Sequence, residues 1–473
     1  MIHHDLMNFS SSLSNFRVLA KQSLHAASAA AVQTSRLWWL PEICGLLFVC
    51  VLSAGQAPAA VIYYTHGTSN GGLARIAIQE QTGQWQGHQA IEGPTLNHPK
   101  KLVITQDGGY AMVTSEETDL TWFFQLGSAP KFLKELKLGS ETSEVAMIGN
   151  RALLCAGEGF FYAIDPQKAK IEKTWNAETD LSPSGRKGED ILYLPNEQVA
   201  LVSFQKDSKK GKHQGNRLVV FDPQRFAAKY DLSLPRDHPE LHIASDLREQ
   251  GPSPEVILVA KKCNTLVLTL DLYGALAFAD MNAALRGQWK NLEYLPTSLG
   301  GEWGTAFPDR GLMFEIGGKE HMLISNASDQ GGIVLVNVAE RKITQKFPCQ
   351  AGAELPVWLP TAKKAVTVIS GKVKARESSG ISNEVSGQGN ELFVFDLAPL
   401  EVGGDATLER ITFESPVTRV ESVSQGANQI LLLLCGKEGA QEWLVYDLAT
   451  HAILHREAAK GVVSRVAPWH PQQ

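Results

Sequence analysis

The sequence predicts an all-β fold: a single β-propeller of eight four-stranded blades closed by the C-terminal strand, with seven blades as the alternative count. Three observations lead to this prediction: a recurring hairpin phrase, its regular spacing, and one unmatched strand at the C-terminus. In the phrase, an alternating apolar run ends at Asp or Asn and a turn follows. These positions lie 51 to 59 residues apart, at Asp165, Asp222, Asp280, Asn337, Asp396 and Asp447. A nearly fixed period of this length is typical of a repeat array.

Each repeat contains enough apolar runs for four strands. The side chain at the Asp position can accept hydrogen bonds from the next backbone N–H groups, which predicts a hairpin turn. The strand before it alternates, as at Leu218 and Val220, and two further apolar runs precede it, such as 191–194 and 199–204. Four strands per repeat predict a propeller blade.

The two ends of the chain predict how the ring closes. Two earlier units, whose third strands end near residues 78 and 126, bring the count to eight. The first unit has no innermost strand, whereas one spare apolar run, residues 462–467, follows the last hairpin. We expect this run to pair with residues 61–65 and to complete the first blade, which removes two exposed sheet edges.

Two stretches resemble a known superfamily. Residues 102–115 read LVITQDGGYAMVTS within the unit from His98 to Phe124, and residues 161–175 form a second matching hairpin. Both are similar to the repeat units of bacterial YVTN-type, WD-repeat-like β-propellers. The resemblance is at the level of the fold. Propellers of this kind serve as binding surfaces, lactonases and redox scaffolds, so the resemblance does not select a function.

The composition fits one large domain. The chain has 473 residues, 44% of them hydrophobic, and a formal net charge of −6. The repeat accounts for residues 60–473, so we expect one propeller domain that is a monomer. The negative charge argues against a general nucleic-acid partner.

Residues 1–59 predict a targeting segment. No acidic residue occurs between Leu6 and Pro41, residues 43–54 are apolar, and small residues follow at 57–59. This pattern is typical of a secretory signal peptide with a long basic front. It predicts an extracytoplasmic protein, periplasmic or secreted, with no stable membrane span after cleavage. An uncleaved membrane anchor and an organellar transit segment are the alternatives.

The cysteines predict thiols and not disulfides. Four of them follow the targeting segment, and the repeat assigns them to four different blades: Cys155, Cys263, Cys349 and Cys435. Matching positions in separate blades cannot meet, and no CxxC spacing indicates a structural zinc site.

The lengths of the connections predict a working surface. In a propeller, the loops between strands two and three and between blades open on one face, here called the long-loop face. Long segments fall there at 176–190, 205–216, 235–254, 296–302 and 371–390, whereas the opposite face is expected to have tight turns, including every Asp hairpin. Long loops on a rigid scaffold usually carry function. The alternative is that they are tolerated insertions.

Three of these loops have distinct character. Residues 205–217 form a basic loop that could contact an acidic glycan, a lipid headgroup or a partner protein, or could be merely solvated: Lys206, Lys209, Lys210, Lys212, His213 and Arg217. Residues 371–390 are rich in Ser, Gly, Asn and Glu and predict a mobile segment, either a flap or simple disorder. His238, His242, Asp246 and Glu249 have no metal-ligand spacing, so no metal site is expected there.

The residues at the entrances of the innermost strands are the candidates for a ligand site at the axis. Glu302 and Trp303 lie between glycines ahead of one such strand, and similar entrances hold His98, Asp190, Glu255, Glu354 and Arg419. Converging carboxylates and a histidine could hold an ion or a sugar. The alternative is that these residues are polar because the axis is wet.

Recognisable catalytic motifs are missing from the sequence. It has no G-x-S-x-G elbow, no CxxCH haem attachment and no phosphate-binding glycine loop. We therefore expect a non-catalytic, exported binding platform whose long-loop face contacts a protein or polysaccharide partner, without a cofactor and with no catalytic residue assigned. The alternative is a lactonase-like or hydrolytic enzyme with a divalent cation in a carboxylate-lined axial site.

Overall fold

The computed structural model describes residues 59–67, 71–115, 117–139, 141–176, 187–206, 214–328, 332–349, 352–369, 371–377, 380–385, 389–424 and 428–469. Residues 58–473 form one compact unit. Residues 1–58 of the predicted targeting segment lie outside the described residues, and Ala59 begins the first strand. Within the described part of the chain, no helix is both long and apolar enough to cross a bilayer.

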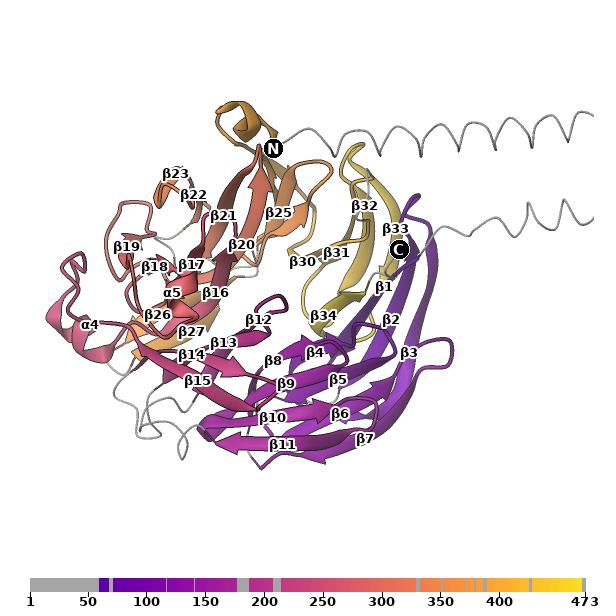
Figure 1. Cartoon of the computed structure of the whole chain (residues 1–473). Helices are drawn as coiled ribbons and strands as arrows, with labels where there is room; N and C mark the ends of the chain where they lie inside the picture. Colours follow the sequence, from indigo (N-terminus) through magenta and orange to yellow (C-terminus); the bar gives the residue numbers. More distant parts are fainter. Residues whose placement is uncertain are drawn as a thin grey trace, which may run out of the picture. The chain divides into compact units, whose positions relative to one another are not determined.

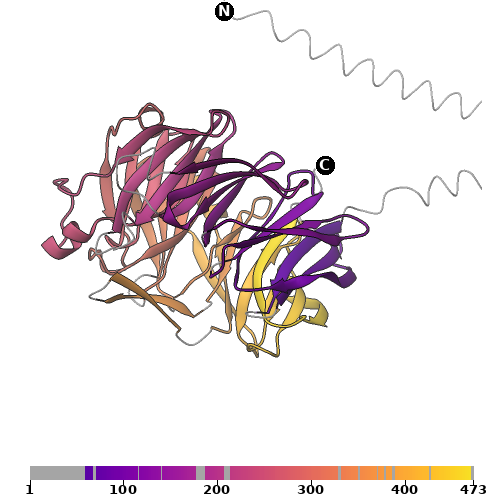
Figure 2. The same ribbon diagram turned by 90° about the horizontal axis from the view of Figure 1, so that it is seen from below.

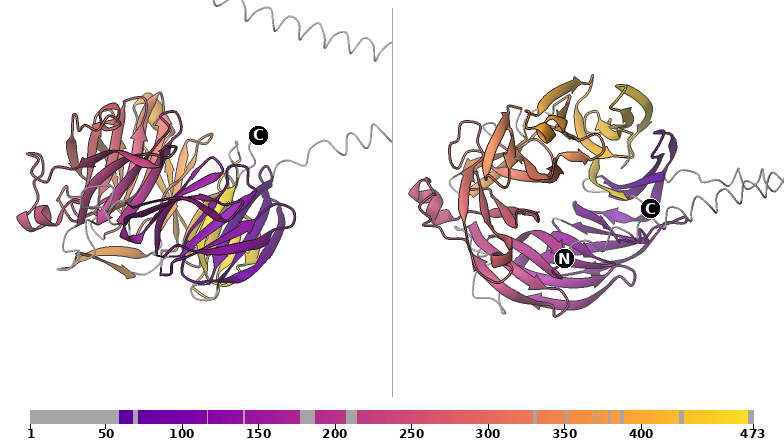
Figure 3. Two further views of the ribbon diagram at one scale, coloured as in Figure 1. Left: turned by 60° about the horizontal axis from the view of Figure 1, so that its bottom comes forward. Right: turned by 45° about the horizontal axis from the view of Figure 1, so that its top comes forward.

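The described strands form eight four-stranded antiparallel sheets arranged in a ring (Figures 1 and 3), which confirms the predicted eight-bladed propeller. From the axis outward, blade 1 contains β34 (Val463–Trp469), β1 (Ala59–His66), β2 (Gly71–Gln79) and β3 (Trp85–Leu96), and blade 2 contains β4 (Pro99–Ile104), β5 (Tyr110–Ser115), β6 (Leu120–Gln125) and β7 (Lys131–Lys137). Blade 3 contains β8 (Thr142–Ile148), β9 (Arg151–Ala156), β10 (Phe160–Asp165) and β11 (Lys170–Asn176). Blade 4 contains β12 (Lys187–Leu194), β13 (Val199–Lys206), β14 (Gln214–Asp222) and β15 (Ala227–Ser233). Blade 5 contains β16 (Pro254–Ala260), β17 (Thr265–Leu270), β18 (Ala275–Asp280) and β19 (Glu293–Pro296), and blade 6 contains β20 (Pro308–Ile316), β21 (Lys319–Asn326), β22 (Ile333–Asn337) and β23 (Lys342–Phe347). Blade 7 contains β24 (Val357–Leu359), β25 (Lys364–Val368), β28 (Glu391–Asp396) and β29 (Thr407–Thr412). Blade 8 contains β30 (Val417–Ser422), β31 (Ile430–Cys435), β32 (Glu442–Asp447) and β33 (Ala452–Ala458).

The C-terminal strand closes the ring, as predicted. β34 pairs antiparallel with β1, so that Tyr63 lies opposite Ala467 (Figure 1). Its neighbours on both sides also hold it: Arg419 of blade 8 donates to the carbonyl of Ser464 at 2.6 Å, and Arg465 donates to the carbonyl of Lys100 in blade 2. Blade 1 is therefore built from both ends of the propeller domain.

Hydrophobic packing between blades stabilises the ring. The buried apolar side chains of the described residues form eight clusters, one between each pair of neighbouring blades. The cluster between blades 8 and 1 contains Trp443, Tyr64 and Ile62, all fully buried. Fully burying one large apolar side chain stabilises a fold by roughly 1.5–3 kcal/mol, so each interface contributes substantially. Blade 1 packs on blade 8 as the other blades pack on their neighbours, which is the packing signature of a closed ring.

The repeated Asp or Asn caps the hairpin between the third and fourth strands, as the sequence predicts. Oδ1 of Asp222 accepts hydrogen bonds from the backbone N–H groups of Gln224 and Arg225, both at 2.9 Å. In five other blades, Oδ1 of the corresponding residue also accepts a hydrogen bond from a backbone N–H two or three residues later: Asp165, Asp280, Asn337, Asp396 and Asp447.

The prediction that every one of these hairpins is tight is wrong in two blades. After Asp280 the connection runs through residues 281–292 and includes α5 (Met281–Ala284), because the Asp280 carboxylate caps this helix. After Asp396 the connection 397–406 includes the 3₁₀ turn η2 (Ala398–Val402), which has a proline at its start. The connections on the long-loop face remain longer in general, but the two faces differ less than the sequence suggests.

The four cysteines of the propeller are thiols at separate blade interfaces, and the segment predicted as a mobile flap contains a hairpin. Cys155, Cys263, Cys349 and Cys435 carry thiols and not disulfides, and they belong to four different inter-blade clusters. Residues 371–390, for which a mobile flap is predicted, contain an antiparallel hairpin of β26 (Lys372–Glu377) and β27 (Gly380–Val385).

Removing the closing strand should destabilise the whole ring. We expect deletion of residues 461–473 to expose the edge of β1 and the apolar cluster between blades 8 and 1, because β34 covers both. The melting temperature and the solubility of the truncated protein should both fall sharply. A truncated protein as stable as the parent would show that β34 is dispensable for closure.

The hairpin cap should be worth about 1 kcal/mol, the typical value for a side chain that caps otherwise unpaired backbone N–H groups. Asp222→Ala is expected to lower the free energy of unfolding by about this amount in a urea titration. Asp222→Asn keeps the Oδ1 acceptor and should lose clearly less. Equal losses in the two variants would assign the effect to the carboxylate charge instead of the cap.

Candidate functional site

The innermost strands begin at the long-loop face, and most of them carry a β-bulge at the beginning. The register with the second strand shifts there in β34, β4, β8, β12, β16, β20 and β30. A bulge re-aims the side chain of the extra residue. In blades 4, 5 and 6 the bulged positions hold Glu189, Glu255 and Asp309, so three consecutive blades present a carboxylate at this level.

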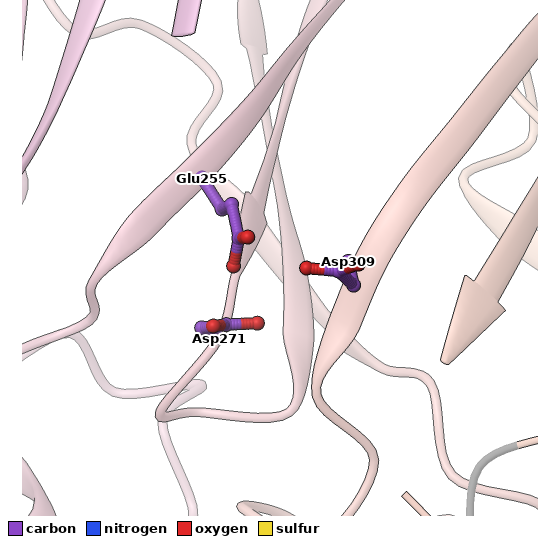
Figure 4. Close-up of side chains that lie close together, drawn as sticks. All are labelled: Glu255, Asp271 and Asp309. Carbon is purple, nitrogen blue, oxygen red and sulfur yellow. The ribbon is translucent and has the colours of Figure 1, made fainter. Parts of the chain in front are cut away.

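The carboxylates of Glu255 and Asp309 converge with that of Asp271, which directly follows β17. Oxygen atoms of Glu255, Asp271 and Asp309 all lie within 4.8 Å of one another (Figure 4). Glu255 and Asp271 are buried, and Asp309 is half-buried. Glu255 follows Pro254 in blade 5 just as Asp309 follows Pro308 in blade 6, whereas Asp271 is the first residue after β17. We call these three residues the carboxylate cluster.

The loop between β19 and β20 braces the turn that carries Asp271. The backbone N–H of Gly304 donates to the carbonyl of Tyr273 at 2.7 Å, and that of Thr297 donates to the carbonyl of Gly274 at 2.9 Å. Gly274 has a positive φ of 58°, and a Cβ there would meet the Gly304 nitrogen at 2.9 Å. The turn therefore requires glycine, and its close contact with the loop fixes the position of Asp271.

Arg310 supplies positive charge beside the carboxylate cluster. Its Nη1 lies 3.0 Å from Oδ2 of Asp309, and 41% of its side chain is accessible to solvent. Asp309 raises the pKa of Arg310 most, and Glu354, Glu255 and Asp271 raise it further, while burial opposes them. One guanidinium thus interacts with four carboxylates from blades 5, 6 and 7.

Asp190 links two blades and is not part of this cluster. Its Oδ2 accepts from the backbone N–H of Ile257 in β16 at 2.8 Å, and its Oδ1 accepts from that of Ile191 at 2.9 Å. Burial raises the pKa of Asp190 to about 6, and the carboxylate of Glu144 adds to the increase. The structure therefore gives Asp190 a role in holding β16 against β12.

Glu354 and Arg419 lie further along the same arc of the ring. Burial raises the pKa of Glu421 to about 7; Arg419 lowers this pKa and Glu354 raises it. The carbonyl of Glu354 accepts hydrogen bonds from Ser325 and Thr367, which joins blades 6 and 7. Arg419 combines its interaction with Glu421 with the hydrogen bond to β34 described above.

The remaining predicted axial residues make their contacts in surrounding loops. His98 has a positive φ of 46° and forms an exposed ion pair with Glu117 at 3.2 Å. The exposed Glu302 accepts a hydrogen bond from Ser298 at 3.0 Å. Trp303 packs against the cluster between blades 4 and 5. The structure thus places Glu255 in the carboxylate cluster and Glu354 near Arg310, but it does not bring the predicted set together at one point.

The loop between β15 and β16 is an ordered support. It contains α4 (Ser245–Gln250), and Leu241, Ile243 and Leu247 are buried against blades 4 and 5. Glu240 accepts a hydrogen bond from the backbone N–H of Tyr294 at 3.0 Å, so the loop is tied to β19. Among the described residues, His238, His242, Asp246 and Glu249 belong to no group with metal-ligand spacing.

The predicted basic loop is shorter than expected. β13 ends at Lys206 and β14 begins at Gln214, so Lys209, Lys210, Lys212 and His213 lie outside the described residues. Arg217 is inside β14, where it is half-buried and forms an ion pair with Asp231 on β15. Arg217 therefore belongs to the blade and not to a loop tip.

Comparison with known proteins supports the fold alone. No protein-family profile and no curated protein matches the chain. The dihydro-heme d1 dehydrogenase NirN, solved in complex with DHE, has a TM-score of 0.61 and 12% identity, covering 88% of this chain and 76% of that one. Apo AztD from Citrobacter koseri has a TM-score of 0.54 and 14% identity, covering 88% and 99%. These similarities confirm the expected resemblance to β-propellers.

The buried carboxyls predict how stability depends on pH. The pKa values of Glu421 and Asp190, about 7 and about 6, exceed their usual values of 4.5 and 3.8, so the folded state binds these protons more tightly than the unfolded state. The resulting stabilisation is complete below about pH 4 and is lost as the pH rises through 6 to 7.

The substitution Glu421→Gln places an uncharged side chain at this position at every pH, so it should remove part of this loss of stability. In urea titrations between pH 5 and 8 we expect a flatter pH dependence and a higher free energy of unfolding at pH 8 than in the parent. Parallel curves for the two proteins would show that Glu421 titrates normally.

Proposed function

We propose that this protein is a binding propeller that takes a cationic group of a partner protein at the axial mouth of its long-loop face. The axial mouth is the region around Glu255, Asp271, Asp309, Arg310 and Glu354. The observation that carries the proposal is the convergence of carboxylates there: oxygens of Glu255, Asp271 and Asp309 lie within 4.8 Å of one another beside Arg310.

Burial makes this concentration of carboxylates costly. Like charges within a few ångströms repel strongly where water is partly excluded. The oxygens of the carboxylate cluster lie within 4.8 Å of one another, and two of its three members are buried. Binding an ammonium or guanidinium group would offset this repulsion, because an added positive charge attracts every carboxylate of the cluster.

The surrounding loops supply a rigid frame for a macromolecular partner. The connection 297–307 is bonded to the Asp271 turn, and the connection 234–253 packs on blades 4 and 5. Preorganised loops lower the entropy cost of association. The acidic mouth favours a protein with an exposed Lys or Arg over an acidic polysaccharide. The basic residues of 206–213 are a second contact in this proposal, suited to an acidic patch of the same partner.

A metal-dependent hydrolase is the second candidate function, because the carboxylate cluster offers the oxygen ligands that Ca²⁺, Mg²⁺ or Mn²⁺ prefer. The cluster draws on two blades, since Glu255 and Asp271 both belong to blade 5. In this alternative, Glu255, Asp271 and Asp309 would hold the ion, and Arg310 would bind an anionic group of the substrate. Extracytoplasmic location, periplasmic or secreted, belongs to both candidates and stays a prediction.

Charge-selective binding tests the proposal. A fluorescent oligolysine peptide should bind the full chain in an anisotropy titration, and oligoglutamate should not. Glu255→Gln/Asp309→Asn is expected to weaken oligolysine binding about tenfold, which corresponds to roughly 1.4 kcal/mol. The matched control Glu92→Gln/Glu135→Gln makes the same change in net charge on exposed outer strands and should leave binding unchanged.

Equal weakening in both double variants, with unchanged melting temperatures, would contradict the proposal, because attraction by net charge alone would explain it. A parallel titration with Mn²⁺ separates the two candidates. Mn²⁺ binding that is lost in Glu255→Gln/Asp309→Asn, without selectivity for oligolysine, would favour the metal-dependent alternative.

A further inference from the structure

The interface between blades 8 and 1, here called the seam, encloses a histidine among its apolar side chains. His88 lies on the outer strand β3 of blade 1, and its side chain is only 4% exposed. Its Nε2 lies 2.6 Å from the hydroxyl oxygen of Tyr64, which is fully buried against Trp443 of blade 8. Trp85 meets the His88 ring edge-on, with centroids 6.0 Å apart. This histidine is therefore held inside the interface at which the ring closes.

Hydrogen-bond donors surround the Tyr64 hydroxyl on its other sides. Its oxygen accepts from the backbone N–H of Lys460 at 3.2 Å. The indole N–H of Trp443, which is enclosed beside it, has no acceptor of its own among the described residues. The Tyr64 proton is therefore directed to His88, and Nε2 must be unprotonated to accept it. The hydrogen-bond network thus selects the neutral imidazole with its proton on Nδ1.

Protonation of His88 would break this network. A charged imidazole is a donor at both nitrogens, so Nε2–H would point at the Tyr64 oxygen, and the Tyr64 proton would have no acceptor left among these neighbours. Leaving a buried polar group unsatisfied costs stability. The other nitrogen, Nδ1, lies 3.7 Å from Oε1 of Glu457, which is too long for a direct hydrogen bond.

The charged groups around His88 come from three elements. β33 contributes Glu457 and His455, whose Nε2 also lies 3.7 Å from the Glu457 carboxylate; β1 contributes His66; and the turn after β33 contributes the ammonium of Lys460. Burial lowers the pKa of His88 most, and Lys460 and His66 lower it further, while Glu457 opposes them. The net result is a pKa below the usual 6.5, because one carboxylate that is 41% exposed does not outweigh burial and the nearby positive charge.

A second histidine at the seam responds in the same direction. The ring of His66, at the end of β1, lies close to two glycines: a Cβ on Gly72 would meet its Nε2 at 2.9 Å, and a Cβ on Gly461 would meet its Nδ1 at 3.4 Å. Gly461 shortly precedes the closing strand β34. Burial lowers the pKa of His66, and Lys460 lowers it further. Both rings therefore favour the neutral form while the seam is closed.

We propose that His88 and His66 form a pH-sensitive switch on ring closure: their neutral rings hold blades 1 and 8 together, and their protonation in mildly acidic solution loosens the seam. A histidine whose pKa is lower in the folded state adds stability that is present above its unfolded pKa of about 6.5 and is lost as the pH falls below it. This direction is opposite to that of Glu421 and Asp190. The switch shares no residue with the axial mouth, so it does not depend on the proposed binding function.

Urea titrations of the full chain between pH 7.5 and 5 test this inference. His88→Gln keeps an amide oxygen as acceptor for Tyr64 but cannot titrate. The unfolding constant of the parent, divided by that of His88→Gln at the same pH, should rise at least about threefold as the pH falls over this range. In this ratio the titration of Glu421 and Asp190 cancels, because both proteins share it. Amides of β34 that bond to β1, corrected for intrinsic rates, should also exchange faster in the parent than in His88→Gln at pH 5.

A matched control separates this switch from histidine titration in general. His451 also contacts a tyrosine hydroxyl, that of Tyr446 at 3.1 Å, but its side chain is 49% exposed, so His451→Gln should follow the parent at every pH. His66→Gln, at a half-buried position, should change the ratio in the same direction as His88→Gln, and it decides the test if His88→Gln does not fold. A ratio that stays constant in the deciding variant, or that changes equally for His451→Gln, would overturn the proposal.

Discussion

Pairing between β34 and β1 is the interaction on which the rest of the structure depends. It builds blade 1 from residues near 60 and near 465, and the apolar cluster of blades 8 and 1 forms only when this pairing brings Tyr64 against Trp443. Arg419 and Arg465 extend the link to the blades on either side. In a ring closed in this way β34 covers the edge of β1, and the innermost strands stand at fixed positions around one axis (Figure 2).

Fixed innermost strands explain how residues distant in sequence become neighbours. The bulge that opens β16 and β20 presents Glu255 and Asp309 at the same height, and the turn after β17 adds Asp271 (Figure 4). The ring tolerates this repulsion because eight apolar interfaces, and not the axial residues, supply most of the stability. Under the proposed function, the charged axis gives up local stability for binding.

The fold could be predicted from sequence because its signals are local and repeated. The Asp222 hairpin cap, the alternating third strands and the unmatched C-terminal strand each involve residues close together in the chain. The site could be predicted only in part. Glu255 was identifiable at the start of an innermost strand, but Asp309 required an alignment of the bulges, and Asp271 directly follows a second strand with no sequence signal.

The most direct test of this account is hydrogen exchange of β34 in the intact chain, measured by mass spectrometry. The amides of β34 that bond to β1 can exchange only when this pairing opens, so they should exchange as slowly as the paired amides of β16 and β20, and all three strands should accelerate together in mild denaturant. Rapid exchange of β34 while β16 and β20 stay protected would contradict the account, because the ring would then persist without its closing strand.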